Sequence, residues 1–522
     1  MKKLFTILGL AVLISSFNSV SAQHAGDLDL TFNGTGYFRY DFYGNTDVIN
    51  DIAVQTDRKT VSVGVAFTAA WNVDLKVIRL NEDGTLDATF GDAGVVTYAP
   101  DGMTYYEAHA MAVTMLTDGK ILVAGGVLTQ GGNLNVLLIK LNADGSFDDT
   151  FGINGISQTA LVNGNSIAYD VAIEQDGKIL IAGQSDNADF RHAPTVARFN
   201  SDGSLDLTFA TDGFTQLQVA SSDNEYSSIC LQSDGKIVVS GHFASSSWVY
   251  VTLIARYNTD GSLDSTFGTN GTAMVNLNDF DDEFFGMGIN SNNEIIVGGF
   301  TIGMTSYDMV LMKYDQAGTL VTSFGDNGKV VYNHNNTTYN VIYDLVIQAD
   351  DKIVAVGSSG DAAPNNNDWI ILRFNDDGSL DNTFGTDGAT TTEFFGEQDE
   401  VNAVALDGND NIYVGGKTLN SSVGVRDFTV ARYTNDLHVG IKRPGQSEFT
   451  ISQTGNGIFK LYTTANAEII EVYNVMGVNA GNYDLQSGVY NIDLSSKPAG
   501  VYMYRLIHNG NAIASGKLGV KF

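Results

Sequence analysis

A segment of about 58 residues recurs seven times along the chain, and this repetition constrains the fold more than any other feature. The first marker is Gly-x-Leu-Asp-x-Thr-Phe-Gly-x-x-Gly, with phenylalanines at Phe32, Phe90, Phe151, Phe209, Phe267, Phe324 and Phe384. The second is a turn and an apolar run that ends at Gly64, Gly125, Gly183, Gly241, Gly299, Gly357 or Gly416. The third is an alternating segment with one cation, at Arg79, Lys140, Arg198, Arg256, Lys313, Arg373 and Arg432. Three independent markers at one period define a repeat protein.

Each module predicts four β-strands. One follows the Thr-Phe-Gly turn, as at residues 94–98, and a second is an alternating run such as 110–116. An Asp-Gly turn joins the second strand to the apolar run, and the fourth strand carries the cation. No module has a long stretch of helical periodicity, which argues against an α-solenoid. Four strands at this period are typical of propeller blades, and an open β-solenoid is the alternative.

The two ends of the array indicate a closed ring. The first module begins with the marker, at residues 26–29, whereas the last ends at Tyr433 with Leu437 where the marker's glycine would stand. We therefore predict a strand near residues 37–42 that completes the last blade, because closure satisfies the edges of the array. The expected fold is all-β: a seven-bladed β-propeller of four-stranded blades, plus a small C-terminal β-sandwich. Strand order within a blade, and which face binds, are left open.

The repeat also resembles a known family. The run Asn-x-Asp-Gly-Ser-Leu-Asp-x-Thr-Phe-Gly, at residues 258–268 and 375–385, is similar to the delta-60 repeat of secreted bacterial proteins. The resemblance covers about residues 26–436. It implies a β-propeller-like fold and implies little about activity.

The ends of the chain differ from the repeats. Residues 1–22 carry Lys2 and Lys3, then a short apolar stretch and small residues, which predicts a cleaved secretory signal peptide and not a membrane span. We assign 23–437 to the propeller, 438–447 to a linker and 448–522 to the sandwich.

The last 75 or so residues resemble the type A C-terminal sorting domain of type IX secretion. The resemblance rests on residues 474–477, 492–495, 499–502 and 516–518. It implies that the type IX machinery is a partner and that the protein is secreted or lies on the outer-membrane cell surface. The Pro-Asn-Pro often found at the start of the family is absent, and an accessory binding sandwich is the alternative.

Composition excludes several classes. With 60 acidic and 28 basic side chains the formal net charge is −32, which argues against a nucleic-acid partner. One cysteine excludes a disulfide scaffold, and the scattered histidines form no zinc motif. No nucleotide-binding or nucleophile-elbow motif is present, so no catalytic residue is assigned.

The repeated acidic residues have two interpretations. The marker places aspartates at Asp29, Asp87, Asp148, Asp206, Asp264 and Asp381. We predict that they fix turns and pair with the repeated cations. Val321 replaces the aspartate in one module, so a metal ligand is not needed there. A ring of Ca²⁺ sites is the alternative. Asp279, Asp281 and Asp282, in the densest acidic run, are further Ca²⁺ candidates, and no other cofactor is predicted.

The modules differ most in two loops, and aromatic residues gather there. Loops on a rigid frame usually display binding groups, and exposed aromatics stack on sugars or anchor proteins. We predict a ligand surface for a glycan or a protein that includes Trp71, Tyr105, Tyr106, Trp248, Tyr250, Phe284, Phe285 and Trp369. Further loop aromatics are Phe190, Phe280, Phe394 and Phe395.

These observations favour a non-catalytic binding or adhesion scaffold, since a regular array repeats structural groups while an active site needs unlike groups that meet once. The alternative is an extracellular glycan hydrolase or lyase at one mouth of the ring. Its carboxylates would come from Glu107, Glu225, Glu283, Glu393 and Glu397. A purely structural surface-coat protein is a third hypothesis.

Overall fold

The computed structural model describes two parts of the chain. One is residues 24–435 without 101, 218–223, 246–248, 278–279, 304, 362–365, 395–397 and 421–423. The other is 449–520 without 456–457, 464–468, 475–477, 485–487, 499 and 509–510. The predicted signal peptide and linker lie outside the described residues. The chain divides into two compact units, of which one is His24–Asp436 and the other contains Leu437–Phe522.

Within the described part of residues 24–435, the strands form seven four-stranded antiparallel blades. The first three are β2 (Asp47–Val54), β3 (Thr60–Phe67), β4 (Val73–Leu80) and β5 (Val95–Tyr98); β6 (Ala108–Met115), β7 (Ile121–Leu128), β8 (Leu134–Leu141) and β9 (Ile156–Thr159); and β10 (Ser166–Ile173), β11 (Ile179–Asp186), β12 (His192–Phe199) and β13 (Phe214–Gln216). The next two are β14 (Asn224–Leu231), β15 (Ile237–Ala244), β16 (Tyr250–Tyr257) and β17 (Thr272–Val275); and β18 (Asp282–Ile289), β19 (Ile295–Ile302), β20 (Tyr307–Tyr314) and β21 (Lys329–Tyr332). The last two are β22 (Tyr339–Ile347), β23 (Ile353–Asp361), β24 (Asn366–Phe374) and β25 (Ala389–Thr392); and β26 (Glu400–Leu406), β27 (Ile412–Asn420) and β28 (Val425–Tyr433) with β1 (Tyr37–Tyr40).

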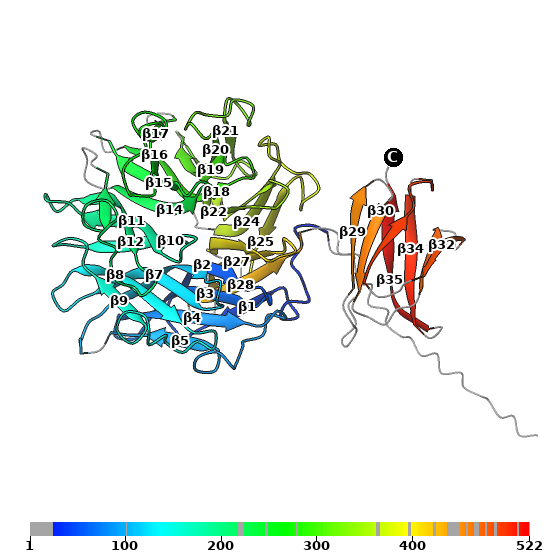
Figure 1. Ribbon diagram of the computed structural model, residues 1–522, viewed down its shortest axis with the longest axis horizontal. Coiled ribbons are helices and arrows are strands. Elements are labelled where there is room, and N and C mark those ends of the chain that lie inside the picture. The colour runs from blue at the N-terminus through cyan, green and yellow to red at the C-terminus, as the bar shows by residue number, and fades with distance from the viewer. Residues whose placement is uncertain are drawn as a thin grey trace, which may run out of the picture. The chain divides into compact units, whose positions relative to one another are not determined.

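The blades close into a ring. The first strand of each blade contacts the first strand of the next, from β2 and β6 round to β26 and β2, and β5, β9, β17 and β21 lie at the rim (Figure 1). The N-terminal β1 pairs antiparallel with β28, Tyr37 lying opposite Ala431. The predicted seven-bladed propeller and its completion by the N-terminal strand are confirmed, and the open solenoid is wrong. The strand after the Thr-Phe-Gly turn is the outermost one, so it belongs to the preceding blade.

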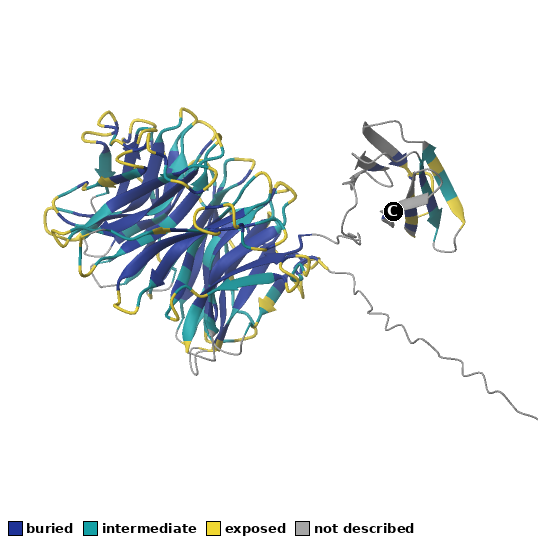
Figure 2. Cartoon of the chain, turned by 90° about the horizontal axis from the view of Figure 1, so that it is seen from below, coloured by how far each residue is buried: buried dark blue, intermediate teal, exposed yellow. Residues whose placement is uncertain are grey.

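The core lies between neighbouring sheets, because the middle strands are buried on both faces. Every residue of β7 except the last is buried, as its unbroken apolar run requires. Figure 2 shows buried strands inside the propeller and exposed residues at its loops. At the seam, Ile49 and Ile78 of the first blade share a cluster with Tyr413 and Val430 of the last, so the seam is packed like the other blade interfaces.

The C-terminal unit has two sheets. One orders β29 (Phe449–Gly455), β30 (Ile458–Thr463) and β33 (Gly488–Asp493); the other orders β32 (Asn479–Asp484), β31 (Ile469–Asn474), β34 (Gly500–His508) and β35 (Asn511–Val520). Phe459 and Ile492 of the first sheet share a core with Val472, Tyr504 and Leu518 of the second. The predicted small β-sandwich is confirmed. None of the segments that the structure describes forms a helix with the length and hydropathy of a membrane span.

Loops alternate between the two faces of the propeller because successive strands of a blade run antiparallel. The loops joining first to second strands and third to fourth strands share one face, where Lys59 meets Asp87. We call it the motif face, since it carries the repeated markers. The other two kinds of loop share the opposite, variable face, where Tyr106 meets Asp74. Both loops that vary most between modules therefore lie on one face, which the sequence left open.

Candidate functional site

On the motif face, each repeated aspartate holds a turn and pairs with the strand cation, and five of the six also lie within 4 Å of a hairpin lysine. Asp87 Oδ2 lies 2.8 Å from both Arg79 Nε and Lys59 Nζ, while Oδ1 accepts from the backbone NH and hydroxyl of Thr89. In Asp148, the bond from Lys120 is the main cause that lowers the pKa to about 2. Equivalent pairs, all at 2.8 Å, are Arg198–Asp206, Arg256–Asp264, Arg373–Asp381 and Arg432–Asp29. The predicted pairing is confirmed, and protein cations occupy the carboxylates of the supposed Ca²⁺ ring.

The same cations join neighbouring blades. Arg198 donates to the carbonyl of Thr259 in the next module at 2.7 Å, and its guanidinium lies 4.7 Å from the centre of the Phe209 ring. Arg432 donates at 2.6 Å to the carbonyl of Glu82, across the seam of the ring. The repeated polar groups of the motif face therefore build the frame.

One module exchanges the signs of its charges. Val321 stands where the aspartate would be, and Glu294 stands where five of the other six modules have the hairpin lysine. Lys313 Nζ lies 2.7 Å from Glu294 and 2.5 Å from Asp376. The carboxylate has thus moved from one loop to the other, which preserves the pair and marks it as structural.

The variable face carries several of the predicted aromatics. Trp71 and Tyr105 are 74% and 53% exposed, and Tyr106 is half-buried. Tyr106 and Tyr43 both donate to the carboxylate of Asp74, at 2.8 and 2.5 Å. These residues form a surface at the first blade. The position of Asp74 holds an aspartate in three later blades as well, namely Asp308, Asp368 and Asp427.

The prediction that Phe284 and Trp369 are exposed loop residues of a ligand surface is wrong. Phe284 lies in β18 and Trp369 in β24, and both are fully buried against the neighbouring blade. Each strand begins before its aromatic residue, so the side chain faces a sheet and not the solvent. Phe285, the next residue in β18, is half-buried, and Tyr250 begins β16. Trp248 lies outside the described residues.

In the acidic run proposed as a Ca²⁺ site, the described carboxylates already accept hydrogen bonds from the protein. Asp282 is buried, and its two carboxylate oxygens accept from the Leu277 NH at 2.6 Å and the Thr301 hydroxyl at 2.5 Å. Asp281 accepts from the Tyr250 NH at 2.9 Å. These oxygens already serve as turn and strand caps. Asp279 lies outside the described residues.

A group of aromatic rings that do not repeat lies in the fifth and sixth blades. Phe285 lies 5.9 Å from Phe300 and 5.6 Å from Tyr343, measured between ring centres. Tyr307 lies 5.3 Å from Phe300 and 5.4 Å from Tyr339, and the hydroxyls of Tyr339 and Tyr343 are 2.7 Å apart. We call these five residues the aromatic cluster. All except Phe300 keep some exposed surface.

Carboxylates flank the aromatic cluster. Burial, then the neighbouring Glu225 and Asp281, raise the pKa of Glu283 to about 7. His242 Nδ1 lies 3.9 Å from Glu283 Oε2, and the His242 ring packs edge-on against Tyr250 at 5.0 Å. Burial and the carboxylate of Glu225 raise the pKa of Tyr169. Unlike groups meet here once, which is what a binding or reaction site requires.

Of the five predicted glutamates, the structure brings together Glu225 and Glu283. Glu107 instead accepts from Tyr105 and lies 3.1 Å from His109 Nε2, in the second blade. Burial and then Glu393 raise the pKa of Asp368, which places Glu393 near β24 of the sixth blade and apart from the pair. Glu397 lies outside the described residues.

Sequence reasoning missed His242, Tyr169 and most of the aromatic cluster. A signal was present: Tyr169, Phe285 and Tyr343 occupy one position in their modules, the extra residue of a β-bulge in the first strand. The same position holds Asn50, Met111, Ser227 and Asn402 elsewhere. Variation within an otherwise regular strand marks residues that the frame does not need.

The fold and this site define a closed β-propeller with one face of repeated pairs and one of unlike groups. Five segments match the profile described as "Domain of unknown function (DUF5122) beta-propeller", at residues 55–90, 116–151, 174–209, 232–267 and 348–384. The chain therefore carries DUF5122 β-propeller repeats. No curated protein matches the sequence.

Several solved structures are distantly similar. A protein of unknown function from Bacteroides caccae is 13% identical, covers 55% of this chain and 87% of its own, and has a TM-score of 0.31. PorZ, a surface component of the type IX secretion system of Porphyromonas gingivalis, is 10% identical, with coverages of 91% and 82% and a TM-score of 0.26. The polysaccharide lyase Uly1 is 11% identical, with coverages of 76% and 92% and a TM-score of 0.39. Likenesses this distant do not extend to sites or activities.

Proposed function

We propose that the protein is a secreted or cell-surface scaffold whose variable face binds a ligand in adhesion. The observation that carries the proposal is the division between the faces. The repeated charges of the motif face are consumed in joining blades, whereas unlike aromatics and carboxylates gather on and beneath the variable face.

A glycan fits the aromatic cluster best. The half-buried rings of Phe285, Tyr307 and Tyr339 offer apolar faces for sugar C–H groups, and the tyrosine hydroxyls offer hydrogen bonds. These aromatic side chains lie on strands of a closed propeller. Their positions are therefore largely fixed before binding, and the entropy lost on binding is small. A surface protein anchored by the same aromatics is the other ligand class.

The test is a glycan array probed with the chain lacking residues 1–22. We expect Tyr307→Ala to weaken binding of any retained glycan about tenfold, because one aromatic contact is lost. Phe190→Ala is the matched control, since Phe190 is an exposed aromatic of the third blade that lies outside the cluster. If Tyr307→Ala and Phe190→Ala weaken glycan binding equally, the glycan does not bind at the aromatic cluster and the proposed site is wrong.

An enzyme is the second candidate, and the pair Glu225 and Glu283 favours it. A carboxyl whose pKa is about 7, beside a second carboxylate, can donate or accept a proton near neutral pH. If the protein cleaves a bound glycan, Glu283→Gln should abolish turnover and leave binding within a few-fold. New reducing ends without ultraviolet absorbance would indicate a hydrolase, and new reducing ends together with ultraviolet absorbance of an unsaturated product would indicate a lyase. Binding without either product favours the scaffold.

We further propose export by type IX secretion through the C-terminal sandwich. Support comes from the sequence resemblance over residues 474–518 and from the separate core of this unit. In a host with this machinery, deletion of residues 448–522 should leave the propeller in the periplasm. Cell-surface propeller in the deletion strain would overturn the proposal.

A further inference from the structure

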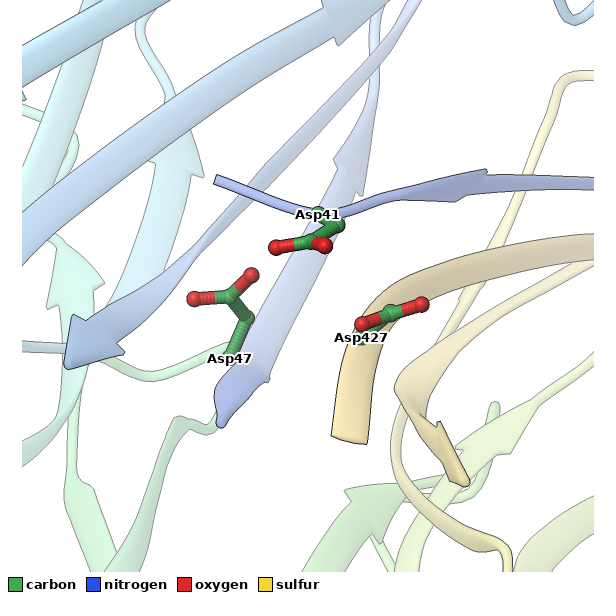
Figure 3. A group of neighbouring side chains, drawn as sticks. All are labelled: Asp41, Asp47 and Asp427. Carbon is green, nitrogen blue, oxygen red and sulfur yellow. The ribbon is translucent and has the colours of Figure 1, made fainter. Parts of the chain in front are cut away.

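Three carboxylates meet at the seam where the ring closes. Asp41 follows β1, Asp47 begins β2 and Asp427 lies in β28, so they come from the first and last blades (Figure 3). One oxygen from each lies within 4.8 Å of the others. Asp47 and Asp427 are buried and Asp41 is exposed. No other group in the described residues meets this spacing.

Asp47 contributes a buried oxygen without a partner. Its side chain is 0% exposed, and Oδ2 accepts from the Phe42 NH at 2.8 Å. Oδ1 is buried and has no hydrogen-bond partner among the residues that the structure describes. A buried carboxylate oxygen without a donor is costly, and its neighbours here are two further carboxylates.

The repeat supplies an internal comparison. Asp282 and Asp399 hold the same position in the fifth and seventh blades, and one oxygen of each caps the preceding loop as Asp47 does. Their other oxygens accept from the Thr301 hydroxyl at 2.5 Å and from the Leu419 NH at 3.0 Å. Only at the seam does the second oxygen of this aspartate lack a protein donor. Capping the loop uses Oδ2 of Asp47 and therefore does not account for the buried Oδ1.

Protein cations offset part of the charge. Arg39 Nε lies 2.8 Å from Asp427, and the Gly44 NH donates to Asp41 at 2.6 Å. Burial, then Asp41 and Asp427, raise the pKa of Asp47 to about 7, while the Phe42 NH and Lys76 act in the opposite sense. Three carboxylates thus face one paired guanidinium and the ammonium of Lys76, so the seam has more acidic than basic groups.

We propose that Asp41, Asp47 and Asp427 bind a divalent cation of the Ca²⁺ class. Carboxylate oxygens are the ligands that hard cations prefer, and oxygens on opposite sides of Ca²⁺ stand about 4.8 Å apart. Water would complete the coordination on the exposed side at Asp41. Zinc is a poorer fit because the group has no histidine or cysteine.

The bound cation would join the connection between β1 and β2 to β28, which only ring closure brings together. It would therefore act on the stability of the closed ring, and it does not depend on a ligand at the aromatic cluster. Neither set of Ca²⁺ candidates predicted from the sequence, the repeated aspartates or the acidic run of the fifth blade, includes these three residues.

The test uses the full chain without residues 1–22, treated with chelator and then titrated with CaCl₂ by calorimetry. We expect one site at the seam and a higher midpoint of thermal unfolding in Ca²⁺ than in chelator, because a ligand that binds only the folded state stabilises it. MgCl₂ should have a smaller effect, since Mg²⁺ demands a stricter geometry. No heat of binding and equal midpoints would overturn the proposal.

Variants locate the site. Asp41→Asn changes an exposed residue, so the variant should fold, and its Ca²⁺ affinity should fall about tenfold or more. Asp47→Asn should lose the response as well. Asp282→Asn is the matched control, because this equivalent aspartate has donors on both oxygens and should keep the Ca²⁺ response. A Ca²⁺ response that persists in Asp41→Asn and Asp47→Asn would place the ion elsewhere and overturn the proposal.

Discussion

The two faces of the propeller use carboxylates in opposite ways. On the motif face Asp264 meets Arg256 and Lys236 at 2.8 and 2.7 Å, and the hydrogen bond from Lys120 lowers the pKa of its equivalent Asp148 to about 2. On the side of the aromatic cluster, burial and Glu225 raise the pKa of Glu283 to about 7. The first arrangement stabilises the ring, and the second costs stability and leaves a reactive group. The stability that the repeated pairs supply thus offsets the unfavourable burial of Glu283.

The largest effect should come from breaking a pair on the motif face. Asp264→Ala leaves two cations without their shared carboxylate, in a site where Asp264 and Arg256 are almost fully buried. Breaking a buried pair costs about 3–5 kcal/mol, so the urea midpoint should fall clearly. Glu283→Gln is the matched change on the other side and should shift stability by about 1 kcal/mol or less, because it removes an unfavourable charge. Equal losses in both variants would remove the contrast between the faces.

A smaller effect tests the module with exchanged charges. Glu294→Lys places a second cation beside Lys313, and Val321→Asp places a second carboxylate near Glu294. Each single change should destabilise the protein, whereas the double variant restores the arrangement of the other blades. We expect a favourable coupling energy of about 1–3 kcal/mol from the double-mutant cycle. Additive effects would mean that the two loop positions do not share one role.

The pH dependence sharpens the contrast further. Asp170 and Asp344, in the innermost strands, have pKa values raised to about 6 and about 7, mainly by burial. The folded state then holds protons that the unfolded state has released, so both groups reduce stability as pH rises from about 4 to 7. Asp344→Asn should flatten this fall by about 4 kcal/mol, measured as unfolding midpoints from pH 4 to 8. An unchanged slope would show that Asp344 ionises as in the unfolded chain.

The smallest effect is expected at Trp71. Its ring is 74% exposed at the tip of the loop between β3 and β4. Trp71→Ala should change the free energy of unfolding by about 0.5 kcal/mol or less. A larger loss would mean that the variable face also supports the frame.

Much of the architecture could be predicted because the same pattern of strands and turns recurs in every module. The turn Asp118-Gly119 and the apolar run after it specify a hairpin on their own, and the missing last marker specifies closure. Burial could not be read in the same way. Phe284 and Phe285 are neighbours in the sequence, yet one packs in the core and the other lies at a bulge.

The candidate site was harder to predict, since ring geometry assembles it. Glu225 and Glu283 approach because they hold one position in adjacent blades, and only the ring makes those positions neighbours. Asp41, Asp47 and Asp427 meet because β1 pairs with β28. Contacts between residues so distant in the chain have no local pattern.

The pairing of β1 with β28 has a consequence for synthesis. The rim strand of the last blade is made first and its partner almost last, so the ring cannot shut until nearly the whole repeat region has been translated. A chain cut short before β28 keeps a lone strand at one end and an uncovered sheet at the other. Such a chain exposes unpaired strand edges at both ends of the open array, which makes premature termination a route to edge-to-edge aggregation.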